Sequence, residues 1–143
     1  MGSINPVYFD TNIYIYYLEN HPQFGNLAEK AIYSAIDRHS PIITSTLLIT
    51  ELLVAPIKQK RFDLIELYTH LEAFLPGLII HPITQPISIL AATLRAENNL
   101  TTPDALHLAT AINHQVATFV TTDQHLAKIK GIPLRLIAID RGQ

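Results

Sequence analysis

The chain has 143 residues, of which 48% are hydrophobic and 15% charged, as expected of one globular domain. Ten Lys and Arg residues against 12 Asp and Glu residues give a net charge of −2, which excludes a strongly basic nucleic-acid binder and an acidic disordered chain. The chain has no cysteine, so disulfides, thiolate metal sites and cysteine nucleophiles are excluded.

The two ends of the chain carry no targeting feature. The amino-terminal segment lacks the basic stretch and apolar core of a secretion signal, and no apolar run approaches the roughly 18 residues that span a bilayer. We therefore expect a cytoplasmic protein with no membrane partner. Residues 1–3 are interpreted as a remnant of cloning, and residues 140–143 are predicted to form a flexible tail.

Apolar periodicity in the first half of the chain predicts alternating strands and helices. Thr46 is the expected amino-terminal cap of a nearly all-apolar helix, and Pro56 is expected to end it, because proline cannot donate a helical hydrogen bond. In chain order the predicted elements are a strand at 4–9, helices at 11–19 and 24–38, a strand at 41–44 and a helix at 47–55.

The second half continues this alternation. Its clearest local pattern is Thr102-Pro103-Asp104, in which Thr102 is the predicted helix cap and Pro103 the first helical residue. The predicted elements are helices at 62–74, 86–98, 103–115 and 123–130 and strands at 78–81, 117–122 and 134–139. No linker interrupts the chain, so we expect a single α/β domain over residues 1–143, with a mostly parallel central sheet flanked by helices.

Several kinds of active site are excluded by the motifs. The five glycines form neither G-x-G-x-x-G nor a P-loop, and no serine lies in a G-x-S-x-G turn. The histidines form no H-E-x-x-H motif. His107 and His114 are seven residues apart on one predicted helix and are interpreted as a solvated face, with His107 close enough to Asp104 to border a site there.

Four acids remain as candidates, each with an ordinary structural explanation. Asp10 and Asp123 follow predicted strands and are suited to cap the helices after them, while Asp104 complements a helix dipole from the first turn. Glu51 is different, because its helix is otherwise apolar or threonine and supplies no partner within one turn.

Taken together, the acids predict a metal site. Asp10 and Asp123 each follow a strand and are expected at the same edge of a parallel sheet, where Asp104 is also able to reach. Clustered carboxylates repel one another unless a cation neutralises them. An all-carboxylate set favours Mg²⁺ or Mn²⁺, which assist phosphodiester hydrolysis by activating water and neutralising the phosphate.

These motifs resemble the PIN-domain ribonucleases, and among them the VapC-type toxins of bacterial toxin–antitoxin pairs. The similar segments are 7–12 (VYFDTN), 50–53 (TELL), 102–111 (TPDALHLATA) and 121–123 (TTD), which lie over most of the chain. The resemblance implies a PIN-like fold and a metal-dependent endoribonuclease that cleaves RNA. It further implies a homodimer and a cognate antitoxin that covers the site. The implied catalytic and metal-binding residues are Asp10, Glu51, Asp104 and Asp123.

Other polar residues are predicted to support this site. Asn12 and Thr122 lie beside signature acids and are expected to orient ligands or water. Four basic residues are candidates for contacts with RNA phosphates: Lys58, Lys60, Arg61 and Arg95.

Two alternatives remain open at the level of sequence. One is a catalytically inert PIN-like module that binds a partner and in which the acids only cap helices. The other is a phosphatase that forms an aspartyl-phosphate on Asp10. Asn12 argues against the phosphatase, because a common version of that mechanism resembles this pattern but has a second Asp at that position.

Overall fold

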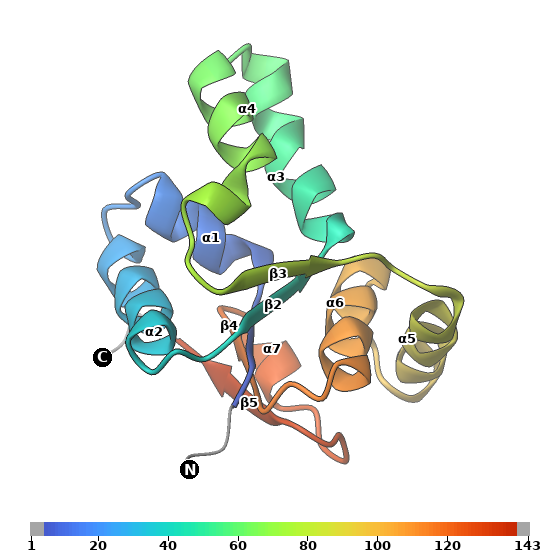
Figure 1. Cartoon of the computed structure of the whole chain (residues 1–143). Coiled ribbons are helices and arrows are strands. Elements are labelled where there is room, and N and C mark those ends of the chain that lie inside the picture. Colours follow the sequence, from blue (N-terminus) through green and yellow to red (C-terminus); the bar gives the residue numbers. More distant parts are fainter. Residues whose placement is uncertain (1–4, 140–143) are drawn as a thin grey trace.

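The structure is a computed structural model that describes residues 5–139. Within them, five strands alternate with seven α-helices (Figure 1). The strands are β1 (Val7–Phe9), β2 (Ile42–Ser45), β3 (Leu78–His81), β4 (Thr118–Thr121) and β5 (Arg135–Ala138). The helices are α1 (Thr11–Leu18), α2 (Gly25–Asp37), α3 (Thr46–Gln59), α4 (Phe62–Thr69), α5 (Gln85–Glu97), α6 (Thr102–Asn113) and α7 (Gln124–Ala127), with a 3-10 turn, η1 (Leu71–Ala73). The predictions for residues 1–3 and 140–143 lie outside the described residues.

The strands form one parallel sheet in the order β3-β2-β1-β4-β5. In the centre, Tyr8 of β1 lies opposite Ile43 of β2 and Phe119 of β4. All described strand pairs are parallel, so every strand ends at the same edge of the sheet. The predicted α/β domain with a parallel central sheet is confirmed.

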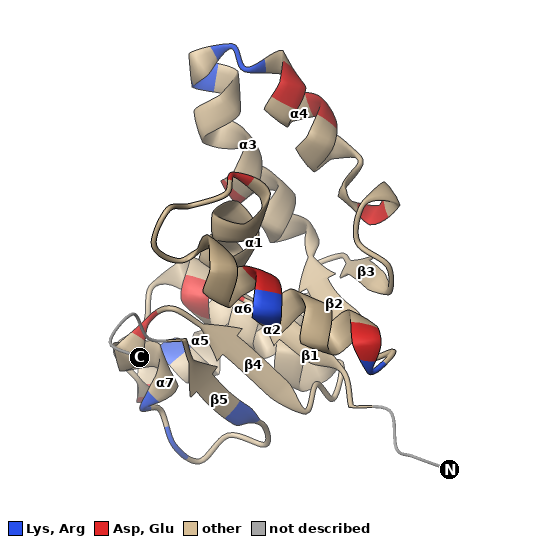
Figure 2. Cartoon of the chain, turned by 90° about the vertical axis from the view of Figure 1, so that its left-hand side faces the viewer, with Lys and Arg blue, Asp and Glu red and all other residues tan. Residues whose placement is uncertain are grey.

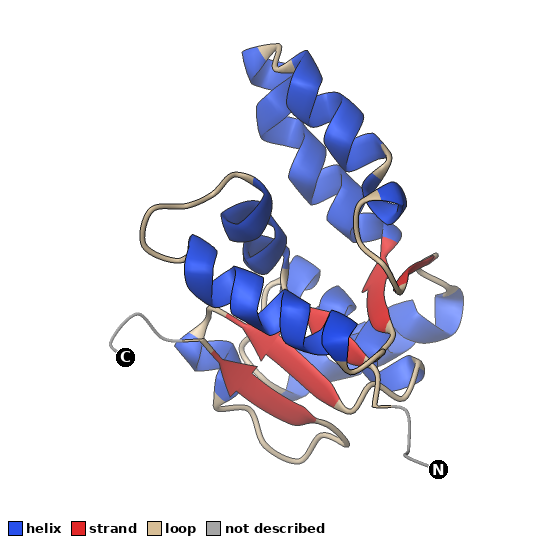
Figure 3. Cartoon of the chain, turned by 60° about the vertical axis from the view of Figure 1, so that its left-hand side comes forward, coloured by secondary structure: helices blue, strands red, loops and turns tan. Residues whose placement is uncertain are grey.

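Helices cover both faces of the sheet, and β1 shows why. Val7 and Phe9 point to the face covered by α1, α2, α3 and α4, whereas Tyr8 points to the face covered by α5, α6 and α7. Successive residues of a strand point to opposite faces, and all three are 3% exposed or less. Figures 1 and 3 show the resulting layers, with α2 lying across one face of the sheet.

The helices α3 and α4 form a hairpin that projects from the domain (Figure 1). The prediction that Pro56 ends α3 is wrong. Pro56 is buried inside the helix, which ends at Gln59. The capping residue Lys60 has a left-handed φ of 54°, which lets the N–H of Arg61 donate to the Pro56 carbonyl at 2.9 Å. The missing N–H of proline costs one helical hydrogen bond, which burial of the ring and this terminal turn offset.

Other helix boundaries also differ from the prediction, and the helix predicted at 123–130 is the shorter α7, Gln124–Ala127. Ser45 rather than Thr46 caps α3, and Thr101 rather than Thr102 caps α6, because in each case the earlier residue has the extended backbone that a cap requires. The predicted helix at 62–74 is divided into α4 and η1. Over residues 5–139, no helix combines the length and apolarity needed to cross a membrane.

Candidate functional site

Asp10 lies where β1 ends and α1 begins. Its N–H donates to the Val120 carbonyl at 2.9 Å, which extends the pairing of β1 with β4 by one residue. Oδ1 accepts the N–H of Thr11 at 2.8 Å and caps α1, while Oδ2 accepts the Thr121 hydroxyl at 2.8 Å. Both carboxylate oxygens are therefore fixed by the junction itself.

Asp123 follows the neighbouring strand β4 by two residues and caps α7. Its Oδ1 accepts the N–H groups of His125 at 2.8 Å and Leu126 at 3.3 Å. Its own N–H donates to the hydroxyl oxygen of Thr121 at 3.0 Å, and that hydroxyl donates to Asp10. Thr121 thus connects the two aspartates at the carboxyl edge of the sheet, as their positions after parallel strands predict.

Asp104 is half-buried in the first turn of α6. Burial raises the pKa of the Asp104 carboxyl above its ordinary value, and the charges of Asp10 and Asp123 raise it further, outweighing the opposing effects of Thr101 and His107. The charges of Asp10 and Asp123 therefore act on Asp104 at this edge of the sheet.

Glu51 lies in the second turn of α3, with 28% of its side chain exposed. Its Oε1 accepts the Thr11 hydroxyl at 2.7 Å and lies 2.5 Å from Nε2 of His107. Burial alone raises the pKa of Glu51, but the hydrogen bonds from His107 and Thr11 outweigh it, so that the pKa is lowered. The partners that the sequence lacked nearby are 40 and 56 residues away along the chain.

Sequence reasoning placed His107 beside the site but gave it the wrong environment. The prediction of a solvated face is wrong for this residue, which is 1% exposed, because α6 packs between the sheet and α5 and is buried over most of its circumference. Its Nδ1 lies 2.5 Å from the Tyr8 hydroxyl. His114 is half-buried and stacks on His81 with ring centroids 3.6 Å apart. A histidine and a tyrosine in otherwise apolar buried segments both need polar partners, and that need was the available indication.

The hydrogen bonds that orient the acids come from Thr11 and Thr121. Within residues 5–139 no hydrogen bond to the side chains of Asn12 or Thr122 is formed, although both lie next to the acids in sequence. Asn12 is exposed at the start of α1. A role for these two side chains toward water or substrate stays a prediction.

The basic candidates lie in two places. Lys58, Lys60 and Arg61 are at the tip of the α3–α4 hairpin, where Figure 2 shows basic residues next to acidic ones on α4. Arg61 forms an exposed ion pair of 2.8 Å with Asp63. Since an α-helix rises about 1.5 Å per residue, Lys58 lies about 10 Å along α3 from Glu51.

Arg95 lies in the last turn of α5 and has partners of its own. Its Nε donates to the Leu100 carbonyl at 3.0 Å, and its Nη1 donates to the Thr102 hydroxyl at 2.9 Å. These bonds tie the end of α5 to the start of α6, the helix that carries Asp104. Arg95 therefore has a structural role in addition to the predicted one.

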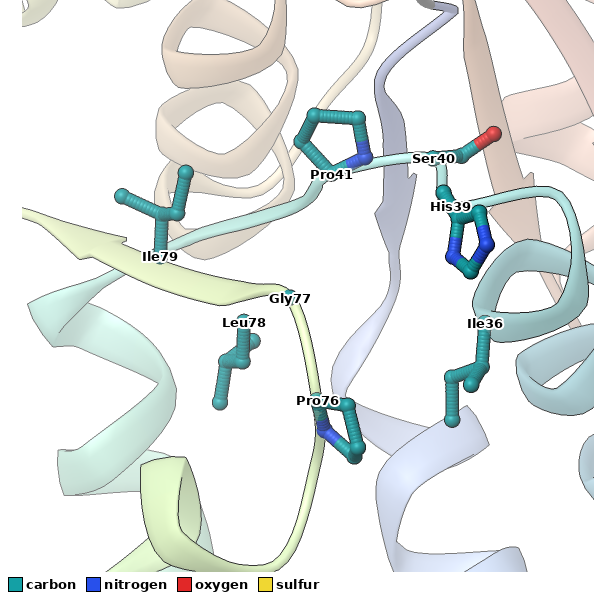
Figure 4. Close-up of a pocket in the computed structure, with 8 residues that line it drawn as sticks. All are labelled: Ile36, His39, Ser40, Pro41, Pro76, Gly77, Leu78 and Ile79. Atoms are coloured by element: carbon teal, nitrogen blue, oxygen red, sulfur yellow. The ribbon is translucent and has the colours of Figure 1, made fainter.

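An apolar cavity of about 420 Å³ lies elsewhere in the molecule. It is formed by the end of α2 and the loops that precede β2 and β3, and Figure 4 shows Ile36, Pro41 and Pro76 around it. These loops are at the amino edge of the sheet, opposite the acids. Its apolar walls offer nothing to the carboxylate chemistry.

Carboxylates are suited to a hard cation, and Thr11 connects two of the acids by donating its N–H to Asp10 and its hydroxyl to Glu51. Across residues 5–139, no group of three or more His, Asp or Glu side chains is arranged to hold a metal ion. Mg²⁺ typically binds through one or two carboxylates and keeps several waters, so an open set suffices. The repulsion acting on Asp104 would be relieved by a cation, and no hydrogen bond in the described part of the chain uses Oε2 of Glu51.

The fold and these residues define a parallel α/β protein with an acidic site at the carboxyl edge of its sheet. The family profile of the PIN domain matches residues 7–132. The chain therefore belongs to the PIN-domain family, as its motifs predicted. Members of this family are nucleases and generally use divalent metal ions.

Several solved structures have the same fold. VapBC2 from Rickettsia felis bound to a DNA fragment from its promoter is 22% identical, with a TM-score of 0.72 over 94% of this chain and 98% of that chain. A toxin–antitoxin complex from Klebsiella pneumoniae is 25% identical, with a TM-score of 0.64 over 90% and 98%. FitAcB from Neisseria gonorrhoeae is 19% identical, with a TM-score of 0.67 over 92% and 96%. No curated protein sequence matches the chain.

Proposed function

We propose that the protein is an endoribonuclease that depends on Mg²⁺ or Mn²⁺ and hydrolyses RNA phosphodiester bonds with water. The observation that carries the proposal is the junction at the carboxyl edge of a PIN-domain sheet where Thr121 hydrogen-bonds to both Asp10 and Asp123, with Asp104 half-buried in the first turn of α6 close enough for their charges to raise its pKa. Helix capping accounts for Asp10 and Asp123 one at a time, whereas a cation that binds a phosphate also accounts for their position beside Asp104.

Each acid has a stated part in this proposal. Asp10, Glu51, Asp104 and Asp123 would hold the ion, with Asp10 kept in place by Thr11 and Thr121 and Glu51 held through Oε1. A bound Mg²⁺ or Mn²⁺ would neutralise the scissile phosphate and make a water molecule a better nucleophile. Attack of that water on phosphorus expels the 3′ oxygen, which takes up a proton, so the products carry 5′-phosphate and 3′-hydroxyl ends.

The biological role within the proposal is that of a VapC-type toxin in the cytoplasm, acting as a homodimer and inhibited by a cognate antitoxin. The complexes among the similar solved structures support an antitoxin partner. The α3–α4 hairpin also exposes large apolar side chains, Val54 at 50%, Ile57 at 57% and Phe62 at 73%. Exposed apolar groups that lie together are typical of surfaces that bind another protein.

We rank the basic residues as contacts for RNA phosphates by whether their side chains already have partners in the protein. Lys58 and Lys60 form no ion pair among the described residues and are the better candidates for phosphate contacts, while Arg61 and Arg95 have partners to give up. Removing a phosphate contact reduces the dependence of binding on salt concentration. An unchanged salt dependence in Lys58→Gln would remove that residue from the interface.

The test is cleavage of defined RNAs by the purified protein with Mg²⁺ or Mn²⁺, with a chelator, and by the variants Asp10→Asn and Asp104→Asn. We expect metal-dependent cleavage that falls at least about 100-fold in both variants, because each removes a carboxylate that holds the ion. The matched control is Asp37→Asn, the same change at an exposed position on α2 remote from the acids, which should cleave normally.

The alternatives have distinct outcomes in this experiment. Cleavage that persists in the variants points to a contaminating nuclease and contradicts the proposal. Absence of Mn²⁺ uptake in calorimetry, with and without RNA, favours an inert binding module. A mass increase that corresponds to a phosphoryl group on Asp10 favours the phosphatase.

A further inference from the structure

We propose that His107 is a positioning residue of the acidic site. It donates a hydrogen bond to one carboxylate oxygen of Glu51 and leaves the other oxygen for the cation. The inference rests on the proposed function, since it assigns the cation to Glu51, and it adds two residues, His107 and Tyr8, that lie behind the acids. A continuous chain of contacts runs from the Tyr8 hydroxyl through the His107 imidazole to Oε1 of Glu51.

The chain is built from buried groups. Tyr8 is fully buried and His107 is 1% exposed, so neither side chain has solvent as an alternative partner. The Tyr8 hydroxyl lies 2.5 Å from Nδ1 of His107, and Nε2 lies 2.5 Å from Oε1 of Glu51. Buried polar groups are almost always hydrogen-bonded, and here each satisfies the next.

The partners determine which ring nitrogen carries the proton. A neutral imidazole with its proton on Nδ1 would turn the lone pair of Nε2 toward the carboxylate oxygen of Glu51, which is repulsive. With the proton on Nε2, the Tyr8 hydroxyl donates to Nδ1 and Nε2–H donates to Oε1. A protonated ring also donates from Nε2. The hydrogen bond to Glu51 is therefore present in both charge states of His107, and the positioning role needs no titration.

The anchor behind the ring is rigid. Tyr8 belongs to β1, the central strand, and stacks on Phe119 of β4 with centroids 5.1 Å apart and planes at 7°. Its edge-on contact with the imidazole has a centroid distance of 5.5 Å. Thr11 supplies a second donor, because its hydroxyl donates to the same Oε1 of Glu51 at 2.7 Å.

The two carboxylate oxygens of Glu51 therefore have different roles, one as a hydrogen-bond acceptor within the protein and the other as a ligand for the cation. Oε1 takes both donors, and within residues 5–139 no hydrogen bond uses Oε2. A glutamate side chain on an exposed helix face samples several rotamers, and fixing it before the ion arrives removes that entropic cost. Loss of such an indirect partner typically lowers metal affinity by about 10- to 100-fold.

Two amide substitutions test this role with little change in polarity. In His107→Gln the amide N–H reaches the place of Nε2 and keeps the hydrogen bond to Oε1 of Glu51. In His107→Asn the amide N–H reaches only the place of Nδ1, so Thr11 is the donor that remains to Oε1. We expect His107→Asn to bind Mn²⁺ about 10-fold or more weakly in calorimetry and to lose kcat with little change in KM. His107→Gln should stay within about 3-fold of the unsubstituted protein. His114→Asn is the matched control, because it makes the same change at the far end of the same helix, where His114 is the capping residue.

Tyr8→Phe tests the anchor separately. It keeps the ring that stacks on Phe119 and removes only the hydroxyl that faces Nδ1. We expect a smaller loss of Mn²⁺ affinity than in His107→Asn. In ¹⁵N spectra of the ring we expect the Nε2-protonated tautomer to be joined by the Nδ1-protonated one, because the hydroxyl that selects between them is gone.

The outcomes separate the inference from the function on which it rests. Normal Mn²⁺ binding and cleavage by the unsubstituted protein, His107→Asn and His107→Gln alike would overturn the inference and leave the proposed function intact. Equal losses in the Asn and Gln variants would also overturn it, because they would show a need for imidazole packing rather than for a donor at Nε2. No Mn²⁺ binding by the unsubstituted protein would refute the proposed function, and the inference with it.

Discussion

The two sides of the acidic edge are built on opposite electrostatic principles. On one side, burial raises the pKa of Glu51, but two donors to its Oε1, from His107 and Thr11, outweigh burial and lower that pKa. On the other side, Asp104 is half-buried beside Asp10 and Asp123, and its pKa is raised. The first carboxylate is stabilised by the fold, while the second is held in an unfavourable environment.

This difference separates what the fold supplies from what a ligand must supply. The side around Glu51 is complete before any ion binds, because hydrogen-bond donors neutralise part of its charge. On the side around Asp104, no Lys or Arg within residues 5–139 forms an ion pair with the three aspartates, and the ring of His107 already contacts Glu51. A cation would therefore be attracted mainly to the aspartates and would meet a pre-oriented Glu51.

The largest effect should come from adding the ion. Mn²⁺ at about 100 times its dissociation constant should raise the free energy of unfolding by about 2.7 kcal/mol, because the folded chain alone has the site. Asp104→Asn should lose most of that gain. Thermal and denaturant unfolding with and without Mn²⁺ measure both, with Asp37→Asn as the control. A gain of equal size in Asp104→Asn would contradict the assignment of the ion to the aspartates.

A smaller effect should distinguish the two carboxylates without metal. Glu51→Gln should lower the free energy of unfolding by about 1–2 kcal/mol, because it weakens two hydrogen bonds to a charged acceptor. Asp104→Asn should leave stability unchanged or raise it by less than about 1 kcal/mol, because it removes like-charge repulsion. Urea unfolding in a chelating buffer compares them. The same sign for both variants would show that the contrast between the two sides does not exist.

The smallest effect is the dependence of stability on pH, and its sign differs between the two acids. The pKa of Glu51 is lowered, so its contribution is present above the ordinary value of about 4.3 and is lost as pH falls through the folded value. The pKa of Asp104 is raised, so the folded chain holds that proton more tightly, and stability declines as pH rises from about 3.9 to the folded value.

Metal-free unfolding curves between about pH 3 and pH 7 test these signs. The stability of Asp104→Asn relative to the unsubstituted protein should increase as pH rises above about 4. The deficit of Glu51→Gln should shrink as pH falls below about 4. Parallel pH curves for all three proteins would contradict both assignments.

Much of the acidic edge was predictable because its residues follow strands. Asp10 and Asp123 lie at the ends of β1 and β4, and parallel neighbouring strands end together, so local pattern and topology are sufficient to bring them to one edge. The sequence indicated Asn12 and Thr122 as the residues that orient the acids, whereas Thr11 and Thr121 form those hydrogen bonds. Which of two adjacent residues points toward an acid depends on the exact end of each strand.

The helices show the same limit in another form. The apolar character of α3 was correctly interpreted, but its continuation through Pro56 was not, because the intrinsic cost of proline is a local quantity and its compensation by burial is not. His107 was assigned to a solvated face because periodicity alone places one side of a helix in water, whereas α6 is enclosed between the sheet and α5.

By itself the sequence determined the alternation of strands and helices, the single parallel α/β domain, the PIN family and the acids at its strand ends, because hydrophobic periodicity and short motifs are local properties of the chain. Only the tertiary structure decided that Glu51 meets His107, that Tyr8 stands behind them and that Asp104 bears the repulsion of two aspartates. These contacts join residues 40 to 99 positions apart or depend on how deeply each is buried, and neither property is encoded in any local stretch of sequence.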